Sequence, residues 1–372
     1  MTVSALAPAP TMRVPGRISG RDNNFNLIRM VAASGVMVSH AFPLSLGRGA
    51  AEPFDGVFAG ANLGRICVFV FFAVSGFYIT QSFLTRRSLG AFLMARVLRL
   101  YPALVVTLLV TAIVLGLFIT TAPPDVYWRQ VPGFLLRRLT FVGGSGGLPG
   151  VFADNPAPNA INGSLWTLFF EVLCYLGVVG LGLAGLLTRR RFGAVIAVCL
   201  VCYAVDHVHP LRFVVHYLMY LGLPFLIGMA FRIWQDRLVL SPWVALLLAL
   251  LAAVLRLGFP PAFEAALVLA VAYTTFVLGF MPGRWLQRYN RLGDYSYGMY
   301  IYAFPVQQTV AHFLSPMTPL ANLAMAFPVT LVCAVLSWHL IEKPALSLKS
   351  GKAAAGPGPS APQPASSAAD PQ

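Results

Sequence analysis

Two ionisable side chains inside one apolar run near the start of the chain are the clearest candidates for a chemical role. The run covers residues 26–46, reads NLIRMVAASGVMVSHAFPLSL, and contains Arg29 and His40. At about 100° per residue, a spacing of eleven residues places both on one helix face, about 16 Å apart along the axis. An ionisable group at membrane depth is costly and is therefore a functional-site hypothesis by default.

Each residue of this pair also has an ordinary explanation. Arg29 can be an end residue that snorkels to the membrane surface, and His40 can be a buried histidine with a structural hydrogen bond. Because the only ionisable groups of the run share one face, we favour a protein-lined cavity in which both act.

A carboxylate in a second apolar run could assist His40. The run GSLWTLFFEVLCYL at residues 163–176 contains Glu171, which forms a polar stripe with Ser164, Thr167 and Tyr175. Glu171 lies about 12 Å below the outer end of its helix, which is close to the expected depth of His40. A carboxylate that orients an imidazole is the usual construction of a general base. The alternative is a charge pair that locks two helices together.

Two further clusters could serve a phosphorylated, elongated ligand. Arg96 and Arg99 are three residues apart at an expected helix start, where both guanidinium groups and the helix N-terminus favour an anion; positive-inside anchoring is the alternative. Ser75 and Gly76 have small side chains and make the predicted helix narrow near the middle of another run. They permit either close helix packing or a slot for a thin ligand.

The elements that must position these residues are membrane helices. The chain has 372 residues, of which 58% are hydrophobic and only 10% charged, whereas soluble domains are about 25% charged. Continuous apolar runs predict an all-α polytopic membrane protein with about ten spans. We expect these at residues 26–46, 64–84, 98–119, 163–187, 192–206, 211–231, 238–256, 262–281, 294–314 and 318–340; Asp294 and the tyrosines after it are typical of a helix N-cap at a membrane interface.

Charge predicts the orientation of these helices. The net charge is +14, but the basic residues lie between apolar runs, which favours membrane orientation and not nucleic-acid binding. Connections on one side carry 18 Arg and Lys, and those on the other side carry 6. The positive-inside rule therefore places both termini in the cytoplasm. The five cysteines lie in apolar segments, and Asp206, His207 and His209 are too few for a metal signature, so no metal site is expected.

The domain organisation follows from the same pattern. We expect a cytoplasmic tail at residues 1–24, one transmembrane domain at 25–346 and a disordered Ala/Pro-rich tail at 347–372. The longest connection, residues 120–162, faces outward and contains GGSGG. It is either a lid or binding loop, or simply mobile.

The motifs together resemble the bacterial membrane acyltransferases known as acyltransferase 3, over nearly all of residues 22–346. The resemblance rests on NLIR separated by ten residues from His40, and on FFAVSGF, RVLR, SLWTLFFEVLCY, GDYSYGMYIYAFPV and IEKP in this order. The chain departs from many members at Phe69, where they have an acidic residue, and at Ala303, where they have a histidine.

The resemblance implies a multi-pass enzyme of the bacterial inner membrane. Such enzymes move an acyl group, commonly acetyl, from cytoplasmic acyl-CoA to a hydroxyl of a surface polysaccharide or oligosaccharide, or of a macrolide in some members. By position, the catalytic residues would be His40, Arg29 and Glu171, and the acyl-CoA contacts would be Arg96, Arg99, Ser75, Gly76 and Phe77. We expect contacts to the acceptor from Ser164, Trp166, Thr167 and Tyr175.

Two other classes of function stay open at this point. A carrier or flippase for a polar lipid-linked molecule would also place ionisable groups in a membrane cavity, although no duplicated halves are visible in the sequence. A membrane protein that senses acyl-CoA without catalysis is the third possibility.

Overall fold

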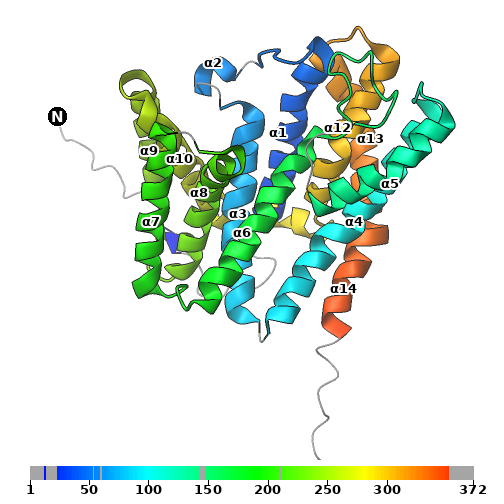
Figure 1. Ribbon diagram of the computed structural model, residues 1–372. Helices are drawn as coiled ribbons and strands as arrows, with labels where there is room; N and C mark the ends of the chain where they lie inside the picture. Colours follow the sequence, from blue (N-terminus) through cyan, green and yellow to red (C-terminus); the bar gives the residue numbers. More distant parts are fainter. Residues whose placement is uncertain are drawn as a thin grey trace, which may run out of the picture.

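The structure is a bundle of long helices that run between two opposite faces (Figure 1). It is a computed structural model that describes residues 12–13, 23–52, 54–58, 61–86, 88–141, 147–209 and 211–351. Most of the two predicted tails and of the GGSGG run lie outside the described residues. The last helix, α14, continues past residue 346 to Gly351.

The prediction of an all-α polytopic membrane protein is confirmed. Eight helical segments of the described chain are long and apolar enough to cross a membrane. They contain α1 (Phe25–Leu46), α3 (Leu63–Thr85), α4 (Leu89–Phe118), α6 (Trp166–Leu183), α7 (Arg189–Val208), α8 (Phe213–Ile233), α10 (Pro260–Phe280) and α13 (Pro319–Ser337). The two other predicted spans coincide with α9 (Pro242–Gly258), which is apolar but shorter, and with α12 (Ser296–Leu314).

Shorter elements connect these helices. They are α2 (Asp55–Phe58), α5 (Pro124–Thr140), α11 (Arg284–Gln287), α14 (Lys343–Gly351), the 3-10 turns η1 (Gly163–Leu165) and η2 (Arg288–Arg291), and the π-helical turn η3 (Trp338–Glu342). A two-residue antiparallel pair joins β1 (Met12–Arg13) to β2 (Val239–Leu240). Side-chain caps begin several helices: Asn62 accepts from the backbone N–H of Arg65 at α3, and Ser88 accepts from that of Ala91 at α4.

The closest helix contact is between α3 and α8. A Cβ atom on Gly76 would collide with the backbone carbonyl of Phe225, and one on Gly228 would collide with that of Ala73. The two glycines therefore let the helix backbones touch, as small residues do in membrane proteins. Phe77, next to Gly76, is fully buried among Phe25, Phe276 and Phe280.

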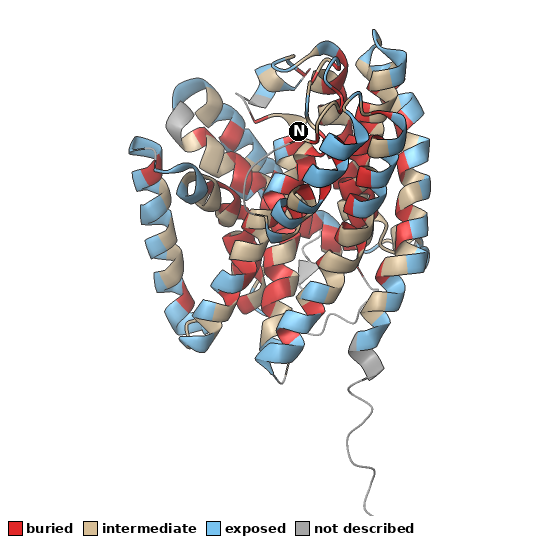
Figure 2. Cartoon of the chain, turned by 45° about the vertical axis from the view of Figure 1, so that its right-hand side comes forward, coloured by how far each residue is buried: buried red, intermediate tan, exposed pale blue. Residues whose placement is uncertain are grey.

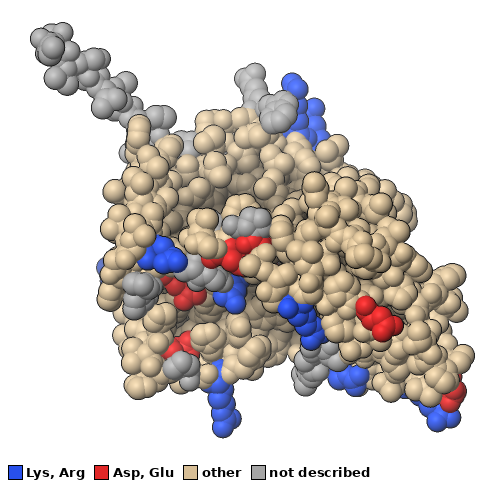
Figure 3. Space-filling view, turned by 90° about the horizontal axis from the view of Figure 1, so that it is seen from above, with Lys and Arg blue, Asp and Glu red and all other residues tan. Residues whose placement is uncertain are grey.

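Buried residues line the inside of the bundle, while exposed residues follow its outer surface (Figure 2). Many of the exposed residues are large and apolar, for example Val110, Leu117, Leu247 and Leu257. On the end of the bundle seen from above, acidic and basic side chains lie close together left of the centre, and others lie near the rim (Figure 3). The exposed apolar side chains on the sides suit a bundle whose outer surface meets lipid.

The described part of the long outer connection is fixed in place. The side-chain amide of Asn155 donates to the side-chain oxygen of Gln308 at 2.8 Å, and that of Gln308 donates to the carbonyls of Ala157 and Ala160. Residues 147–162 therefore form a cap over the outer end of α12. This outcome was not foreseen, because Gln308, the polar partner on α12, lies far away in the sequence.

Candidate active site

An inner cavity of about 150 Å³ lies between α1, α3, α4, α6 and α12. Its polar lining includes most of the residues that the sequence singled out: Arg29, Ser75, Arg96, Arg99, Thr167, Glu171 and Tyr175. The rest is mainly aromatic and aliphatic. Segments far apart in the chain thus bring three guanidinium groups to one hollow in the bundle.

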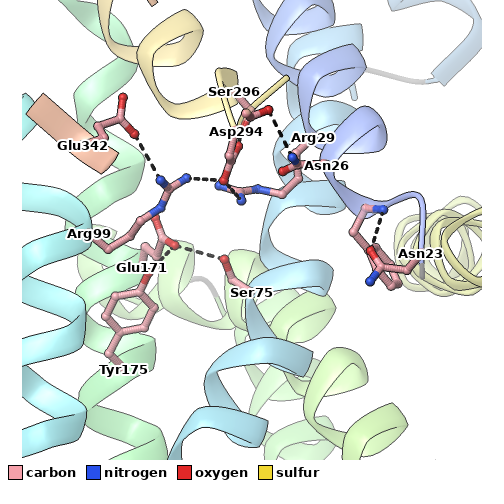
Figure 4. A network of polar contacts seen from close by, with 12 residues as sticks. Asn23, Asn26, Arg29, Ser75, Arg99, Glu171, Tyr175, Asp294, Ser296 and Glu342 are labelled. Atoms are coloured by element: carbon pink, nitrogen blue, oxygen red, sulfur yellow. Dashed lines mark hydrogen bonds and ion pairs between the residues drawn. The ribbon is translucent and has the colours of Figure 1, made fainter. Parts of the chain in front are cut away.

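The carboxylate of Glu171 is held inside this cavity. It accepts hydrogen bonds from Ser75 Oγ at 3.0 Å and from Tyr175 Oη at 2.5 Å (Figure 4). The structure does not bring the predicted pair Glu171 and His40 together. Among the described residues, Glu171 bonds to Ser75 and Tyr175, and the two helices turn Glu171 and His40 into different cavities.

Four charged side chains form a network at the inner end of the same cavity (Figure 4). Arg29 and Arg99 each donate to Asp294 Oδ2 at 2.6 Å, and Arg99 also donates to Glu342 Oε2 at 3.1 Å. Ser296 donates to the second oxygen of Asp294 at 2.6 Å. The network ties α1 and α4 to the start of α12 and to η3.

Asp294 is ionised in this network. It lies two residues before α12, outside the spanning helices. Burial alone would raise the pKa of its carboxyl group, but the charges of Arg29 and Arg99 outweigh burial and hold the pKa at about 2. Near neutral pH the carboxylate is therefore negatively charged, and it lies between the guanidinium groups of Arg29 and Arg99.

Arg96 differs from Arg99, although the two lie one turn apart. Its Nε is buried and has no hydrogen-bond partner, and its guanidinium lies 6.0 Å from the ring centre of Tyr175. The expectation that both arginines lie at a helix start is wrong, because α4 begins at Leu89 and its cap is Ser88. The helix N-terminus thus adds nothing at Arg96. Its guanidinium makes no ion pair with the described residues and is a cation that a ligand in the inner cavity could use.

An outer cavity of about 400 Å³, here called the vestibule, contains His40. The imidazole contacts the ring of Phe304 edge to face, with ring centres 5.2 Å apart. Its Nδ1 is buried and has no hydrogen-bond partner in the part of the chain that the structure describes. Ser164, which is 2% exposed, also has a buried hydroxyl oxygen without a partner. Buried polar atoms are nearly always hydrogen-bonded, so these two are suited to an incoming polar ligand.

Aromatic and charged side chains complete the vestibule. Trp166 packs edge to face against Tyr217, with ring centres 4.9 Å apart, and Tyr217 in turn packs against Tyr220. The charged groups are Glu52, Asp55 and Arg65. Three of the four residues expected to contact an acceptor, Ser164, Trp166 and Thr167, line this cavity, whereas Tyr175 lines the inner one.

The two cavities adjoin one another. Both are lined by Val68, Thr167 and Tyr300, and the hydroxyl groups of Thr167 and Tyr300 lie 2.5 Å apart at this boundary. On its other side the inner cavity shares Arg29 and Tyr78 with a third cavity, of about 400 Å³, around Asp294 and Lys343. Three hollows therefore follow one another across the bundle, with Arg29 toward one end and His40 toward the other.

Two expected ligand contacts fall outside these hollows. Ser75 lines the inner cavity, but Gly76 faces α8 and Phe77 lies in an aromatic cluster behind α3. The slot predicted at Ser75 and Gly76 is therefore, at Gly76, a point of close helix packing. Within the described chain no group of three metal-ligating side chains is found; Asp206 instead pairs with His216 at 2.7 Å and caps the start of the next segment.

The comparisons with known proteins agree with this arrangement. The acyltransferase 3 family model, described as an acyltransferase domain, matches residues 22–339. An O-acetyl transferase from Shigella phage Sf6 is 29% identical over 339 residues, which cover 89% of this chain and 98% of that protein. Nodulation protein 10 from Rhizobium leguminosarum bv. viciae is 29% identical over 377 residues, which cover 89% of this chain and 95% of that protein. No solved structure matches.

Proposed function

The chain belongs to the acyltransferase 3 family and is an acyltransferase, and from this premise we propose that it transfers acetyl from cytoplasmic acetyl-CoA to a hydroxyl of a cell-surface carbohydrate. It would do so in the bacterial inner membrane, with ten spans and both termini in the cytoplasm. The observation that carries the proposal is the series of three adjoining hollows, with cations at one end and an unpaired imidazole at the other.

The donor end of the path is the inner cavity. The guanidinium of Arg96 would pair with a phosphate of acetyl-CoA, because its buried Nε has no hydrogen-bond partner among the described residues. Arg99 is already bonded to two carboxylates, so its part would be to hold the helices that shape the cavity. Arg29 stands between the inner cavity and the hollow around Asp294, where the donor would enter.

The thioester would reach the vestibule along the boundary at Thr167 and Tyr300. An extended pantetheine arm is thin, and Ser75 and Glu171 line the preceding stretch of the path. Opening the contact between the two hydroxyl groups would join the donor hollow to the acceptor hollow. Until that contact opens, the two side chains separate the thioester from water in the vestibule.

The acyl transfer itself would take place at His40. The imidazole removes the proton from the acceptor hydroxyl, whose oxygen attacks the carbonyl carbon of the thioester. The tetrahedral intermediate then collapses, the carbon–sulfur bond breaks, and the proton passes from the imidazolium to the sulfur of CoA. A positioned general base of this kind contributes about 10²–10⁴-fold to the rate.

The side chains that line the vestibule suit a carbohydrate acceptor. Trp166 and Tyr217 present apolar faces, while Asn62 and Ser164 offer hydrogen bonds to hydroxyl groups. The name of one relative, an O-acetyl transferase, supports an oxygen atom as the acceptor of the acetyl group.

The test is mass spectrometry of surface carbohydrates from cells that carry the wild type, no copy, or His40→Ala at equal membrane abundance. We expect acetylated sugar residues in the wild type only. If the acetyl mass is unchanged among the three strains, a surface carbohydrate is not the acceptor. If the protein instead moves an unmodified lipid-linked molecule between membrane faces, the carrier hypothesis replaces this one.

A further inference from the structure

A fourth cavity, which the proposed reaction does not use, lies between α1, α3, α9 and α10. Its volume is about 790 Å³, the largest of the hollows described here, and its lining is almost entirely aliphatic. We call it the lateral groove. Small side chains on α9 leave the space open: Ala249, Ala252 and Ala253.

The groove is long in the direction of the helices. Along α10 it is lined from Phe263 near the start to Leu278 near the end. At about 1.5 Å per residue, this stretch extends for about 22 Å, most of the hydrocarbon thickness of a bilayer, which is about 30 Å. An elongated apolar hollow in this position suits an extended hydrocarbon chain.

One end of the groove contains a cation without a partner. Arg256 lies in the last turn of α9, its Nε is buried without a hydrogen-bond partner, and it makes no ion pair with the described residues. A guanidinium group binds phosphate in a bidentate manner and gains most where water is scarce. The charge thus complements a lipid whose chain lies in the groove and whose phosphate lies at this end.

The same end of the groove borders the vestibule of His40. Within α2, Asp55 lines the vestibule and Val57 lines the groove; within the first turn of α3, Arg65 lines the vestibule and Ile66 lines the groove. These two short segments contribute side chains to both hollows and lie between them. A head group attached to a phosphate at Arg256 would therefore reach the hollow that contains the imidazole.

We propose that the lateral groove binds the hydrocarbon chain of a lipid-phosphate carrier on which the acceptor is presented to His40. This inference rests on the proposed function and specifies the form of its acceptor. The chain lies along α9 and α10, the phosphate pairs with Arg256, and the attached hydroxyl compound extends over α2 into the vestibule.

The test uses a farnesyl phosphate that carries a photoactivatable diazirine, in phosphatidylcholine nanodiscs that contain the full-length protein. After irradiation, labelled peptides are identified by mass spectrometry. We expect the label to concentrate on α9 and α10. Labelling spread evenly over the lipid-facing helices would overturn the inference.

Two pairs of variants test the contacts. Arg256→Gln should lower labelling by about tenfold, as expected for one lost charge-assisted contact worth about 1.4 kcal/mol, while Arg212→Gln, an exposed arginine on the same side, should not change it. Ala253→Leu narrows the groove and should lower labelling, whereas Val254→Leu on the neighbouring position outside the lining should not. Equal labelling within either pair contradicts the inference.

Competition and activity separate this inference from the proposed function. Phosphatidylglycerol at the concentration of the probe should not displace it; full displacement would mean that the groove holds ordinary anionic phospholipid. The His40→Ala variant should be labelled like the wild type while forming no acylated product. If a variant loses acyl transfer but is still labelled, the result concerns the proposed catalytic role and not the groove. If the wild type is active but is not labelled, the proposal that the groove binds a lipid-phosphate carrier is overturned, and the proposed function is not.

Discussion

The inner network and the outer vestibule differ in how their buried polar groups are hydrogen-bonded. At the inner end, Asp294 bonds to Arg29 and Arg99, and the second cation also bonds to Glu342. In the vestibule, a nitrogen of His40 and the hydroxyl oxygen of Ser164 are buried with no partner. An unmade buried hydrogen bond costs about 1–3 kcal/mol. The paired region thus stabilises the helix arrangement, and the unpaired region is where a substrate is accommodated.

The largest expected effect is that of His40→Ala on activity. Acyl transfer should fall by about 10²–10⁴-fold, yet the melting temperature should hardly change, because Nδ1 loses no hydrogen bond. Product formation from acetyl-CoA and thermal unfolding in detergent would both be measured. Ser34→Ala is the control on the same helix, since its hydroxyl bonds only to the Met30 carbonyl. Near-normal transfer by His40→Ala would remove the imidazole from the mechanism.

The next effect is on stability, at the paired region. Asp294→Ala leaves the charges of Arg29 and Arg99 without their shared partner and should lower the free energy of unfolding by about 3–5 kcal/mol. Denaturant titration in detergent micelles would measure it. The control is Asp236→Ala, which removes an exposed pair with Arg189 and should leave the midpoint unchanged. Equal midpoints for both variants would show that the network does not stabilise the bundle.

Substitution of Arg96 should mainly change the affinity for acetyl-CoA, whereas substitution of Arg99 should mainly change the stability of the fold. Arg96→Gln should weaken acetyl-CoA binding by about tenfold, or about 1.4 kcal/mol, at unchanged stability. Arg99→Gln should mainly lower stability, because it leaves Glu342 and part of the charge of Asp294 unpaired. Calorimetric titration with acetyl-CoA and thermal unfolding would be compared. The reverse order of effects would assign the donor phosphate to Arg99.

Acidification should give the smallest effect. The pKa of Asp294 is lowered in the folded protein to about 2, so its contribution to stability is present above the ordinary value of about 4 and is lost as the pH falls through about 2. At pH 3 the loss should be about 1 kcal/mol. In the Asp294→Asn variant, the free energy of unfolding should lack this dependence on pH. If the variant and the wild type lose the same free energy of unfolding between neutral pH and pH 3, an ionised Asp294 in the network is contradicted.

Much of the fold was predictable because apolar runs report membrane helices directly. Each of the ten predicted spans overlaps a helix, including the short run at 192–206, which proves to be the 20-residue α7. The amphipathic helix α5 was not predicted, since the long connection was interpreted as loop from its glycines and prolines. The start of α4 was placed about nine residues late, because its arginines resembled a loop between spans.

The sequence pointed to the arginines and the histidine of the candidate site, but not to the side chains with which the arginines and Glu171 pair. Arg29 and His40 both line cavities, but they line two different ones and not the single shared cavity that their common helix face predicted. Asp294 was interpreted as a helix cap, and Glu342 was not considered. Their arginine partners lie between 195 and 265 residues away in the sequence, so no local pattern could reveal them. The turn of Glu171 toward Ser75, away from His40, likewise depends on how α3 and α6 pack.

The measurement that tests the account most directly is sided acyl transfer in sealed proteoliposomes of known protein orientation. Radiolabelled acetyl-CoA is supplied only to the face near Arg29 and Lys343, or only to the face near His40, with an acceptor carbohydrate on both sides. The account predicts labelled product only when the donor is at the Arg29 face, with the product at the His40 face. Equal labelling from either face, or product on the donor side, would contradict a single reaction path through the bundle.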